Sequence, residues 1–360
     1  EHRMKSAAKT VAFLPAHPAQ LWMMLALSRE VAKFARVRWV LRDKDNLVQL
    51  ASRLQIGNEI FTTAGTGVFG NGVEFLRGLK RAFEIERTVD PDLWFTKYGP
   101  ANMIAKLRRK ISISFNDDDV DIVPLIAWTS YPFSEHVLTP ACTRMGAFEK
   151  KAWRYNSYHE LFYLHPNRFT PDPSIRNELC LSEGEKFGII RLSSLKAHHD
   201  LGIRGMAEHT VLRIIELFST RCRVFISSES PLSENLKPYR ISIPPDRIHH
   251  AMAFAEFYVG DSQTMAAEAA VLGTPSFRLS DFAGRISYLE DLERYELTCG
   301  FRPQQENLLI EKMKAEVLQP GSRDRHQERR KKLLEEKADP IPIVSQLIKE
   351  KLYRGHSSTA

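Results

Sequence analysis

The stretch FYVGDSQTMAAEAAVLGTPSFRL, residues 257–279, contains the pattern that decides the fold. An apolar run ends at Asp261, an alanine-rich segment follows, and Gly273 and Pro275 close that segment before a second apolar run. Glycine just past a helix end, with proline soon after it, is a typical helix stop. The stretch therefore predicts strand, helix and strand in succession, and short connections of this kind indicate parallel strands.

The same alternation runs through most of the chain. Strands are expected over 10–15, 37–42, 58–63, 92–97, 111–116 and 136–140, and then over 187–193, 223–228, 248–251, 256–261 and 276–279. The pattern breaks between about 141 and 183, where the Pro-rich stretch 165–174 reads as a linker. A Gly-rich loop is expected over 64–72 and a short helix over 233–239.

These segments predict an α/β protein with two Rossmann-like parallel-sheet domains facing across a cleft, a GT-B-like architecture. The N-terminal, acceptor-side domain is expected over 5–165 and the C-terminal, nucleotide-sugar-binding domain over 175–335. A last helix, 340–355, is expected to pack back on the N-terminal domain.

Composition narrows the class of protein. The chain has 360 residues and a formal net charge of +7, and part of the excess lies in KLRRK (106–110) and in 323–337. These runs read either as solvated helix faces or as a surface attracted to anionic ligands or membranes. No nucleic-acid-binding module is visible. The four cysteines lack CxxC spacing, which favours free thiols and a cytoplasmic protein, and neither a secretion signal nor a membrane-spanning stretch is expected.

The exit of the 256–261 strand is a candidate phosphate site. Ser262, Gln263 and Thr264 come directly after it, where parallel sheets bind ligands and where a helix N-terminus offers free N–H groups. Glu268, one turn further, could accept hydrogen bonds from two ribose hydroxyls. The alternative is an ordinary capped strand-turn-helix.

Two neighbouring strand exits add candidates to the same domain. Arg191 and Ser193 lie at the end of the 187–193 strand, His198 follows that strand, and Ser228 ends the 223–228 strand. A basic group at this edge could hold a departing diphosphate.

The N-terminal domain has its own candidates. Asp117 and Asp118 follow the 111–116 strand, where one could be a general base toward an acceptor hydroxyl, or both could share Mg²⁺; a polar capping turn is the alternative. His17 follows the first strand, although Pro15 and Pro18 could simply shape that turn. His159 could donate to a sugar or phosphate with Glu160 orienting it, or could pack at the domain junction.

A resemblance sharpens these expectations. VGDSQTMAAEAAVLGTPSFRL (259–279) resembles the donor-site segment of UDP-N-acetylglucosamine 2-epimerases and related GT-B glycosyltransferases, which implies diphosphate binding at Ser262 and ribose binding at Glu268. Over about 10–320 the chain is similar to an uncharacterised bacterial and archaeal GT-B-like family (domain of unknown function, family 354). The segments that carry this similarity are SFNDDDVDIVP (114–124), HVLTP (136–140), YHELFYLHPNRFTPDPS (158–174) and the 261–275 stretch.

The resemblance implies a glycosyltransferase of surface polysaccharide or glycan synthesis. It would need no metal or cofactor, would use an NDP-sugar, UDP-linked by analogy, and would act on a glycan or lipid-linked acceptor, with peripheral association at the inner face of the cell membrane. The alternatives are a nucleotide-sugar 2-epimerase or hydrolase and a non-catalytic sugar-nucleotide-binding subunit. Against an epimerase, Gly99 falls near the position where the epimerases carry an acid-base aspartate, in PDLWFTKYGPAN (91–102).

Overall fold

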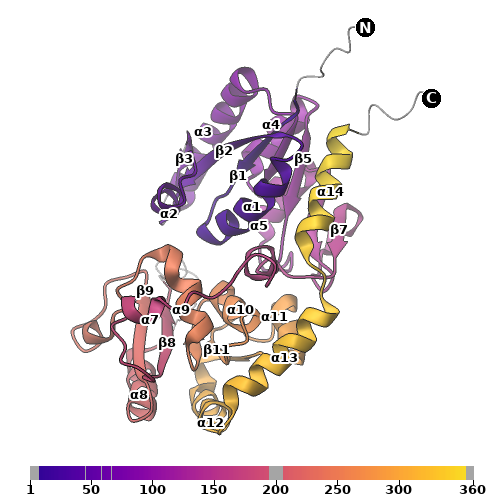
Figure 1. Ribbon diagram of the computed structural model, residues 1–360. Helices are drawn as coiled ribbons and strands as arrows, with labels where there is room; N and C mark the ends of the chain where they lie inside the picture. The colour runs from indigo at the N-terminus through magenta and orange to yellow at the C-terminus, as the bar shows by residue number, and fades with distance from the viewer. Residues whose placement is uncertain (1–7, 45, 58, 66, 194–205, 354–360) are drawn as a thin grey trace. The chain divides into compact units, whose positions relative to one another are not determined.

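The computed structural model describes residues 8–44, 46–57, 59–65, 67–193 and 206–353 (Figure 1). The chain forms two compact units. The first runs to Tyr163 and takes up the chain again from Ala338, and the second comprises Leu164–Lys337. Within the described residues no helix is both long and apolar enough to cross a membrane.

The first unit is built on a seven-stranded sheet in the order β3-β2-β1-β4-β5-β6-β7, and every pairing is parallel. The order reverses between β1 and β4, which are neighbours although two strands separate them in sequence. The strands are β1 Thr10–Leu14, β2 Arg36–Asp43, β3 Glu59–Thr63, β4 Leu93–Thr96, β5 Ile111–Phe115, β6 His136–Pro140 and β7 Ala152–Tyr155.

Helices cover both faces of this sheet. Val40 packs in a cluster with α3 and α4, whereas the adjacent Leu41 packs in a second cluster with α1 and α2. Adjacent strand residues point to opposite faces, so the two clusters lie on opposite sides of the sheet. The main helices are α1 Pro18–Val31, α2 Leu47–Arg53, α3 Gly67–Thr88, α4 Gly99–Leu107 and α5 Pro124–Ser130, with short helices η1 Tyr131–Phe133, η2 Gly146–Lys151 and α6 Leu161–Leu164.

The C-terminal helix α14, Pro340–Tyr353, belongs to the first unit. It packs on α1, and Tyr353 Oη donates to the carbonyl of Phe34 at 2.7 Å. Its apolar side, which includes Val344 and Ile348, is buried. The last helix is therefore part of the same folding unit as the first strand, more than 300 residues earlier in the chain.

The second unit has a five-stranded parallel sheet in the order β12-β11-β10-β8-β9. Its order reverses between β8 and β10. The strands are β8 Phe187–Leu192, β9 Arg223–Ser228, β10 Tyr258–Gly260, β11 Ser276–Leu279 and β12 Thr298–Phe301. The helices are α7 Ile175–Glu178, α8 Glu208–Phe218, α9 Ile248–Phe254, α10 Gln263–Val271, α11 Ser287–Arg294, α12 Glu306–Val317 and α13 Ser322–Glu336. Three single turns, η5 Lys237–Tyr239, η6 Pro245–Arg247 and η7 Pro303–Gln305, connect them.

The structure confirms the two-sheet α/β prediction but corrects the second sheet. The predicted strand 248–251 is the first half of helix α9, which starts right after the Pro244-Pro245 turn. The strand that completes the sheet is instead β12, whose short sequence TCGF gave no strand signal. Gly300 within it makes room for another strand's side chain, since a Cβ there would lie 2.6 Å from Arg278 Nη2.

Three smaller predictions also change. The interval 141–183, expected to be irregular, contributes the edge strand β7, which pairs with β6. The Gly-rich stretch 64–72 is a loop only at its start, because α3 begins at Gly67. The predicted helix 233–239 is reduced to the turn η5.

Glu74 of α3 anchors the start of the Gly-rich stretch at Gly65. Its carboxylate binds the Arg42 guanidinium at 2.6 and 2.8 Å and accepts from the Gly65 N–H at 2.8 Å and from Tyr98 Oη at 2.9 Å. Burial raises the pKa of Glu74, but these donors outweigh it and lower that pKa to about 2. The stretch is therefore anchored by a buried ion pair to the first sheet, a structural role.

Candidate functional site

Parallel sheets bind ligands beyond the carboxyl ends of their strands, where the strand order reverses. In the second unit that place is the exit of β8 and β10, occupied by Asp261–Thr264, which we call the Asp-Ser turn. In the first unit it is the exit of β1 and β4, and the neighbouring β5 exit carries Asn116–Asp119, which we call the acidic turn.

The Asp-Ser turn begins with a close approach of two strands. A Cβ on Gly260 would lie 2.7 Å from the Arg191 carbonyl oxygen and 2.8 Å from Tyr258 Oη, so only glycine fits. The next residue, Asp261, is buried, and its Oδ1 accepts from both the N–H and the Oγ of Ser193 at 2.7 Å. Burial raises the pKa of Asp261, although the Ser193 hydrogen bonds oppose the rise. Asp261 thus joins the ends of β10 and β8 at the reversal point.

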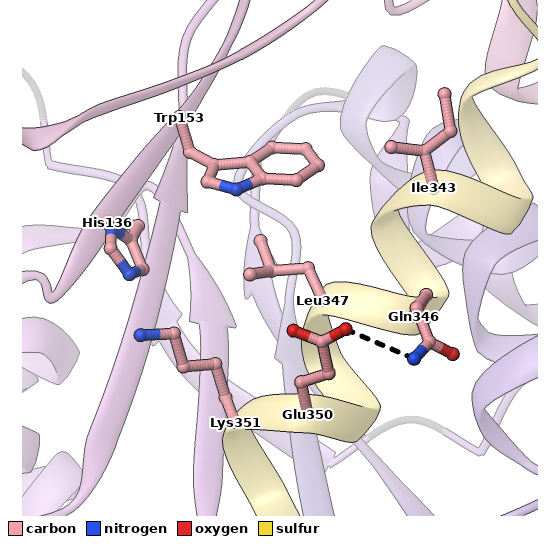
Figure 2. A pocket seen from close by; sticks show the side chains of 7 residues that line it. All are labelled: His136, Trp153, Ile343, Gln346, Leu347, Glu350 and Lys351. Atoms are coloured by element: carbon pink, nitrogen blue, oxygen red, sulfur yellow. Dashed lines mark hydrogen bonds between the residues drawn. The ribbon is translucent and has the colours of Figure 1, made fainter. Parts of the chain in front are cut away.

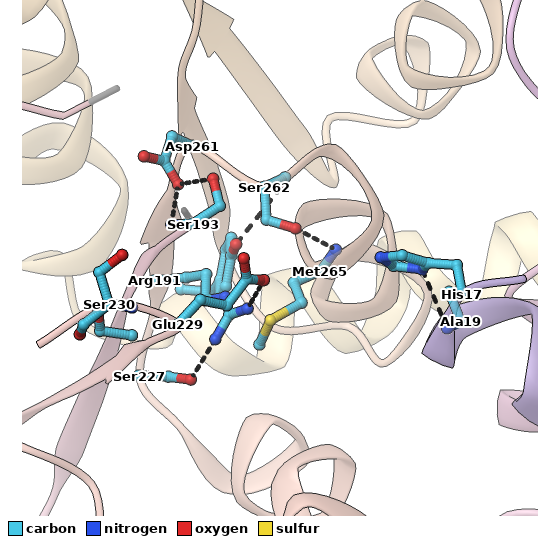
Figure 3. Close-up of polar contacts among 12 residues, drawn as sticks. His17, Ala19, Arg191, Ser193, Ser227, Glu229, Ser230, Asp261, Ser262 and Met265 are labelled. Carbon is cyan, nitrogen blue, oxygen red and sulfur yellow. Dashed lines mark hydrogen bonds and ion pairs between the residues drawn. The ribbon is translucent and has the colours of Figure 1, made fainter. Parts of the chain in front are cut away.

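Ser262 caps helix α10. Its backbone is extended and its Oγ accepts from the N–H of Met265 at 3.3 Å (Figure 3). The N–H groups of Gln263 and Thr264 donate to no described residue, as expected in the first turn of a helix. Two free amides and a serine cap at the positive end of a helix form a cradle that suits a phosphate group.

The side chains of the next two residues differ in their contacts. The Gln263 amide donates to Ser280 Oγ at 2.7 Å and accepts from Arg278 Nη1 at 2.9 Å. Its side chain is therefore held by the interior of the unit, and its backbone N–H is the part left for a ligand. Thr264 is half-buried, and its hydroxyl makes no hydrogen bond with the described residues.

Glu268 lies one turn into α10, as predicted, but it is buried, with 4% of its surface exposed. Its Oε1 lies 3.0 Å from Nε2 of His249, which is equally buried on α9. A ribose contact by Glu268 would therefore involve a carboxylate already oriented by His249. Sequence reasoning missed His249 because it assigned 248–251 to a strand; a helix there puts the residue beside α10.

The side chains of the other candidates described in this unit bind neighbouring groups of the protein. Arg191 Nη1 donates to Ser227 Oγ at 2.9 Å, and its Nη2 pairs with the carboxylate of Glu229 (Figure 3). Ser228 Oγ donates to the Ser230 carbonyl at 2.8 Å and shapes the local turn. Ser193 is bound to Asp261. His198 lies outside the described residues.

In the first unit the acidic turn gathers charges from three segments. His159 Nδ1 lies 3.2 Å from Asp117 Oδ2. Lys97, just after β4, places its Nζ 3.8 Å from Asp117 Oδ1 and 3.8 Å from Asp118 Oδ2. The structure therefore brings together Asp117, Asp118 and His159, three predicted site residues, and adds Lys97, which was not among the candidates.

The two carboxylates differ in their environments. Burial raises the pKa of Asp117, but His159 and Lys97 outweigh burial and hold that pKa well below its usual range. For Asp118, burial and the neighbouring Asp117 charge raise the pKa to about 6. Asp118 is also the more exposed side chain, 26% against 21%. A carboxylate of raised pKa beside a fixed anion is a typical arrangement for a general base.

Asp119 has a structural role. It is fully buried, accepts from the Arg144 N–H at 2.7 Å and pairs with that residue's guanidinium at 2.7 Å. Asn116 turns its Nδ2 toward the carbonyl of Asp118. These two residues hold the acidic turn in shape and leave Asp117 and Asp118 to face the cation cluster.

Several buried polar atoms around the acidic turn make no hydrogen bond with any described residue: His159 Nε2, Asn116 Oδ1, Tyr155 Oη and Tyr131 Oη. The His159 ring lies between Phe115 and Tyr155, with ring centroids 5.6 and 6.3 Å away. Burial raises the pKa of Tyr155 and of Tyr131, so both phenols stay neutral. Because buried polar atoms are almost always satisfied in folded proteins, such a cluster suits a polar ligand or bound water.

His17 caps helix α1. Its Nδ1 accepts from the Ala19 N–H at 3.3 Å, which places the proton of the neutral ring on Nε2. In the same turn Gln20 Oε1 accepts from the Ala16 N–H at 2.9 Å. A neutral His17 in this tautomer can donate from Nε2 but cannot act there as a base.

A pocket of about 430 Å³ lies elsewhere in the first unit, between α14 and the strands β6 and β7 (Figure 2). Its walls are His136, Trp153 and a stretch of α14 in which Gln346 donates to Glu350 at 3.2 Å. None of the predicted site residues lines it. Among the described residues no group of three or more His, Cys, Asp or Glu side chains is arranged to hold a metal ion.

Solved structures similar to this chain include proteins named as UDP-N-acetylglucosamine 2-epimerases and as glycosyltransferases. A protein assigned as a UDP-N-acetylglucosamine 2-epimerase from Listeria monocytogenes matches with a TM-score of 0.69 and 11% identity, over 99% of this chain and 98% of that one. A co-structure of S. aureus MnaA with UDP matches with 0.64 and 11%, over 96% of each chain. The calicheamicin glycosyltransferase matches with 0.55 and 13%, over 98% of this chain and 100% of that one.

The chain therefore has a GT-B-like fold with two Rossmann-like domains, as predicted. No protein-family model and no curated protein matches the sequence. Membership of family 354 stays a prediction.

Proposed function

We propose that the chain is a glycosyltransferase that uses a nucleotide-diphosphate sugar, UDP-linked, in the synthesis of a surface polysaccharide or another glycan. The observation that carries the proposal is the start of α10, where Ser262 and two free amides meet the end of β10 at the strand-order reversal. The donor diphosphate would bind there, with the helix dipole and Arg191 balancing its charge. Thr264 would contribute its hydroxyl.

Glu268 is assigned to the ribose of the donor, with His249 as its positioning residue. A carboxylate held by a buried imidazole keeps one orientation, which favours two hydrogen bonds to vicinal hydroxyls. The 3.0 Å contact between the two side chains supports this assignment. Ser193 and Ser228 would shape the neighbouring strand exits rather than bind the donor directly.

The acceptor belongs to the first unit. Asp118 would remove the proton from an acceptor hydroxyl, the hydroxyl oxygen would attack the anomeric carbon, and the nucleoside diphosphate would leave with the bonding electron pair. Asp117, Lys97 and His159 would hold Asp118 and the acceptor in place, and no metal ion is required in this scheme. His17, a predicted catalytic residue, would act at most as a hydrogen-bond donor.

A 2-epimerase is the second candidate, because three proteins named as 2-epimerases match with TM-scores of 0.58–0.69, and glycosyltransferases match with 0.55–0.59. The two are separable by their products. The full chain would be incubated with UDP-N-acetylglucosamine and other UDP-sugars, with and without a mixture of saccharide acceptors. UDP release that requires an acceptor supports transfer. A changed sugar or UDP release without acceptor supports an epimerase or hydrolase, and binding without turnover supports a non-catalytic subunit.

The acceptor is proposed to be a glycan or a lipid-linked saccharide. A spinosyn rhamnosyltransferase that matches over 94% of this chain was solved with its aglycone acceptor. Peripheral association with the inner face of the cell membrane is part of the same proposal.

A further inference from the structure

Helix α5 of the first unit exposes two large apolar side chains. Leu125 is 72% exposed and Trp128 is 63% exposed. They are three residues apart, so they lie on the same side of the helix, whereas Ala127 and Ser130 anchor its other side. Single exposed apolar residues are common, but a leucine and a tryptophan together on one short helix form an apolar tip.

The tip is held in place from below. The Trp128 ring contacts the Phe148 ring edge to face at a centroid distance of 5.0 Å, and Phe148 contacts Tyr131 in the same way at 5.5 Å. Both supporting rings are buried. Trp128 is therefore a rigid side chain with one edge packed and the rest exposed.

Two lysines bind the segment that directly follows α5. Lys151 Nζ donates to the carbonyls of Pro132 and Ser134 at 3.0 and 2.6 Å, and Lys106 Nζ donates to the same Pro132 carbonyl at 3.1 Å. The end of α4 and the end of η2 thus meet beside α5.

Further basic residues flank these two lysines. Lys150, Arg108 and Arg109 are exposed and form no ion pair with the described residues. The cationic charge here is therefore left for an external anion.

We propose that this basic-apolar face, made of Leu125, Trp128, Lys106, Lys150 and Lys151, docks on an anionic lipid bilayer. Tryptophan and leucine suit the boundary between headgroups and acyl chains, and unpaired lysines suit anionic headgroups. A protein partner fits less well, because the cores of protein interfaces are depleted in lysine. The KLRRK run is on this account a membrane contact rather than a solvated helix face.

The position of the face gives it a function. Residues 120–123 alone separate Asp119 of the acidic turn from Pro124 at the start of α5, and Asp119 is fixed to Arg144. Docking would place the acidic turn beside the bilayer surface, where a lipid-linked acceptor presents its saccharide. This last step rests on the proposed function, whereas binding to vesicles needs neither donor nor turnover.

The test is co-sedimentation of the full chain with vesicles of phosphatidylcholine alone and of phosphatidylcholine with 30% phosphatidylglycerol, in the absence of nucleotide. We expect binding only to the anionic vesicles, weakened roughly tenfold between about 0.05 and 0.3 M salt because screening shortens the reach of the lysines. Tryptophan fluorescence should shift to the blue on binding, and Trp128→Phe should remove most of that shift.

Matched variants separate docking from folding. Leu125→Ser with Trp128→Ala, and Lys150→Glu with Lys106→Glu, should each lower the partition coefficient about tenfold or more. Leu308→Ser and Lys332→Glu, at exposed sites in the second unit, should leave it unchanged.

Equal binding to both vesicle types, or equal loss in test and control variants, would overturn the proposal. So would a concentration-dependent dimer that disappears in Trp128→Ala, because the face would then be covered by a second copy. Vesicle binding without any sugar-nucleotide turnover would leave the docking surface intact and remove the proposed reaction.

Discussion

The Asp-Ser turn follows β10 at the strand-order reversal of its sheet, whereas the acidic turn follows β5, one strand beyond the reversal of its own sheet, and the polar side chains of the two turns differ in how many partners they have. In the Asp-Ser turn nearly every side chain has an internal partner: Asp261 binds Ser193, Ser262 caps α10 and Gln263 bridges Arg278 and Ser280. In the acidic turn, two carboxylates lie beside each other and buried polar atoms such as His159 Nε2 make no bond with the described residues.

The difference separates two ways of building a binding site. The Asp-Ser turn uses its side chains for rigidity and offers backbone amides to a ligand, so it is preorganised and suits a fixed group such as a diphosphate. In the acidic turn the Asp118 carboxylate lies beside the negative charge of Asp117, and buried polar atoms have no hydrogen-bond partner among the described residues. This arrangement lowers the stability of the folded protein and suits proton transfer. Substitutions in the two turns should therefore have different consequences.

Asp118→Asn should affect turnover most strongly. Loss of the proposed base is expected to lower the acceptor-dependent rate by roughly 10²–10⁴-fold with UDP affinity unchanged. Steady-state rates and calorimetry with UDP measure the two quantities. Asp121→Asn, an exposed aspartate two residues after the turn, is the matched control and should keep full activity. A fully active Asp118→Asn protein would show that the acidic turn is structural.

Asp261→Ala should destabilise the second unit. The variant leaves the half-buried Ser193 N–H without its acceptor, at a cost of about 1–3 kcal/mol in the free energy of unfolding. Denaturant unfolding measures it, and Asp281→Ala, at a half-buried site in the same unit, serves for comparison. Unchanged stability would mean that the turn is not preorganised by this contact.

Glu268→Ala should weaken UDP binding by about 1–3 kcal/mol, the cost of losing a charged hydrogen-bonding partner. His249→Ala should produce a smaller loss, since it removes only the group that positions the carboxylate. Titration calorimetry on folded variants measures both. If UDP binds Glu268→Ala as tightly as the native chain, the ribose assignment is wrong.

Ser262→Ala removes a helix cap and a proposed phosphate ligand. The cap loss should lower stability by about 0.5–2 kcal/mol. Binding of UDP should fall more than binding of uridine, because the proposed contact is to the diphosphate. Equal losses for the two ligands would refute the phosphate role and leave the cap.

The smallest effect concerns pH. The folded-state pKa of Asp118 is raised, so the folded protein binds a proton more tightly than the unfolded chain, and its stability falls as pH rises from about 4 through about 6. Asp118→Asn should therefore raise the melting temperature at pH 7 and leave it nearly unchanged at pH 4. Asp117 has the opposite sign: its lowered pKa adds stability above about pH 4 that is lost on acidification. If Asp118→Asn instead lowered the melting temperature at pH 7, the ionised Asp118 carboxylate would not be destabilising in the folded protein.

Much of the fold could be read from local pattern. Alternation of apolar runs and amphipathic segments predicted six strands of the first sheet, and the helix stop at Gly273 and Pro275 is present in the structure. The errors fell where local and tertiary preferences diverge. Residues 248–251 look like a strand by composition but form a helix after two prolines. β12 is a strand because it pairs along its length with β11, a contact that the local sequence does not indicate.

The candidate site residues also divide into those that local pattern points to and those that depend on tertiary contacts. Residues that follow strands directly, such as Asp117 and Ser262, were found because parallel strands end at one edge. The pairing of Asp117 with His159 and with Lys97 was not predicted, because these residues lie 42 and 20 positions from Asp117 in sequence and meet it only through the tertiary fold. Glu160, adjacent to His159, had been expected to orient that ring, and Asp117 is the carboxylate that contacts it.

Local pattern predicted most strands of the two parallel sheets, the positions of the Asp-Ser and acidic turns and the capped helix after β10, because hydrophobic periodicity and capping depend on residues within a few positions of one another. Local pattern did not predict that Asp117 contacts His159, that the pKa of Asp118 is raised, that Glu268 contacts His249, or that Leu125 and Trp128 are exposed. These properties depend on contacts between segments distant in sequence, which form only when the sheets are assembled.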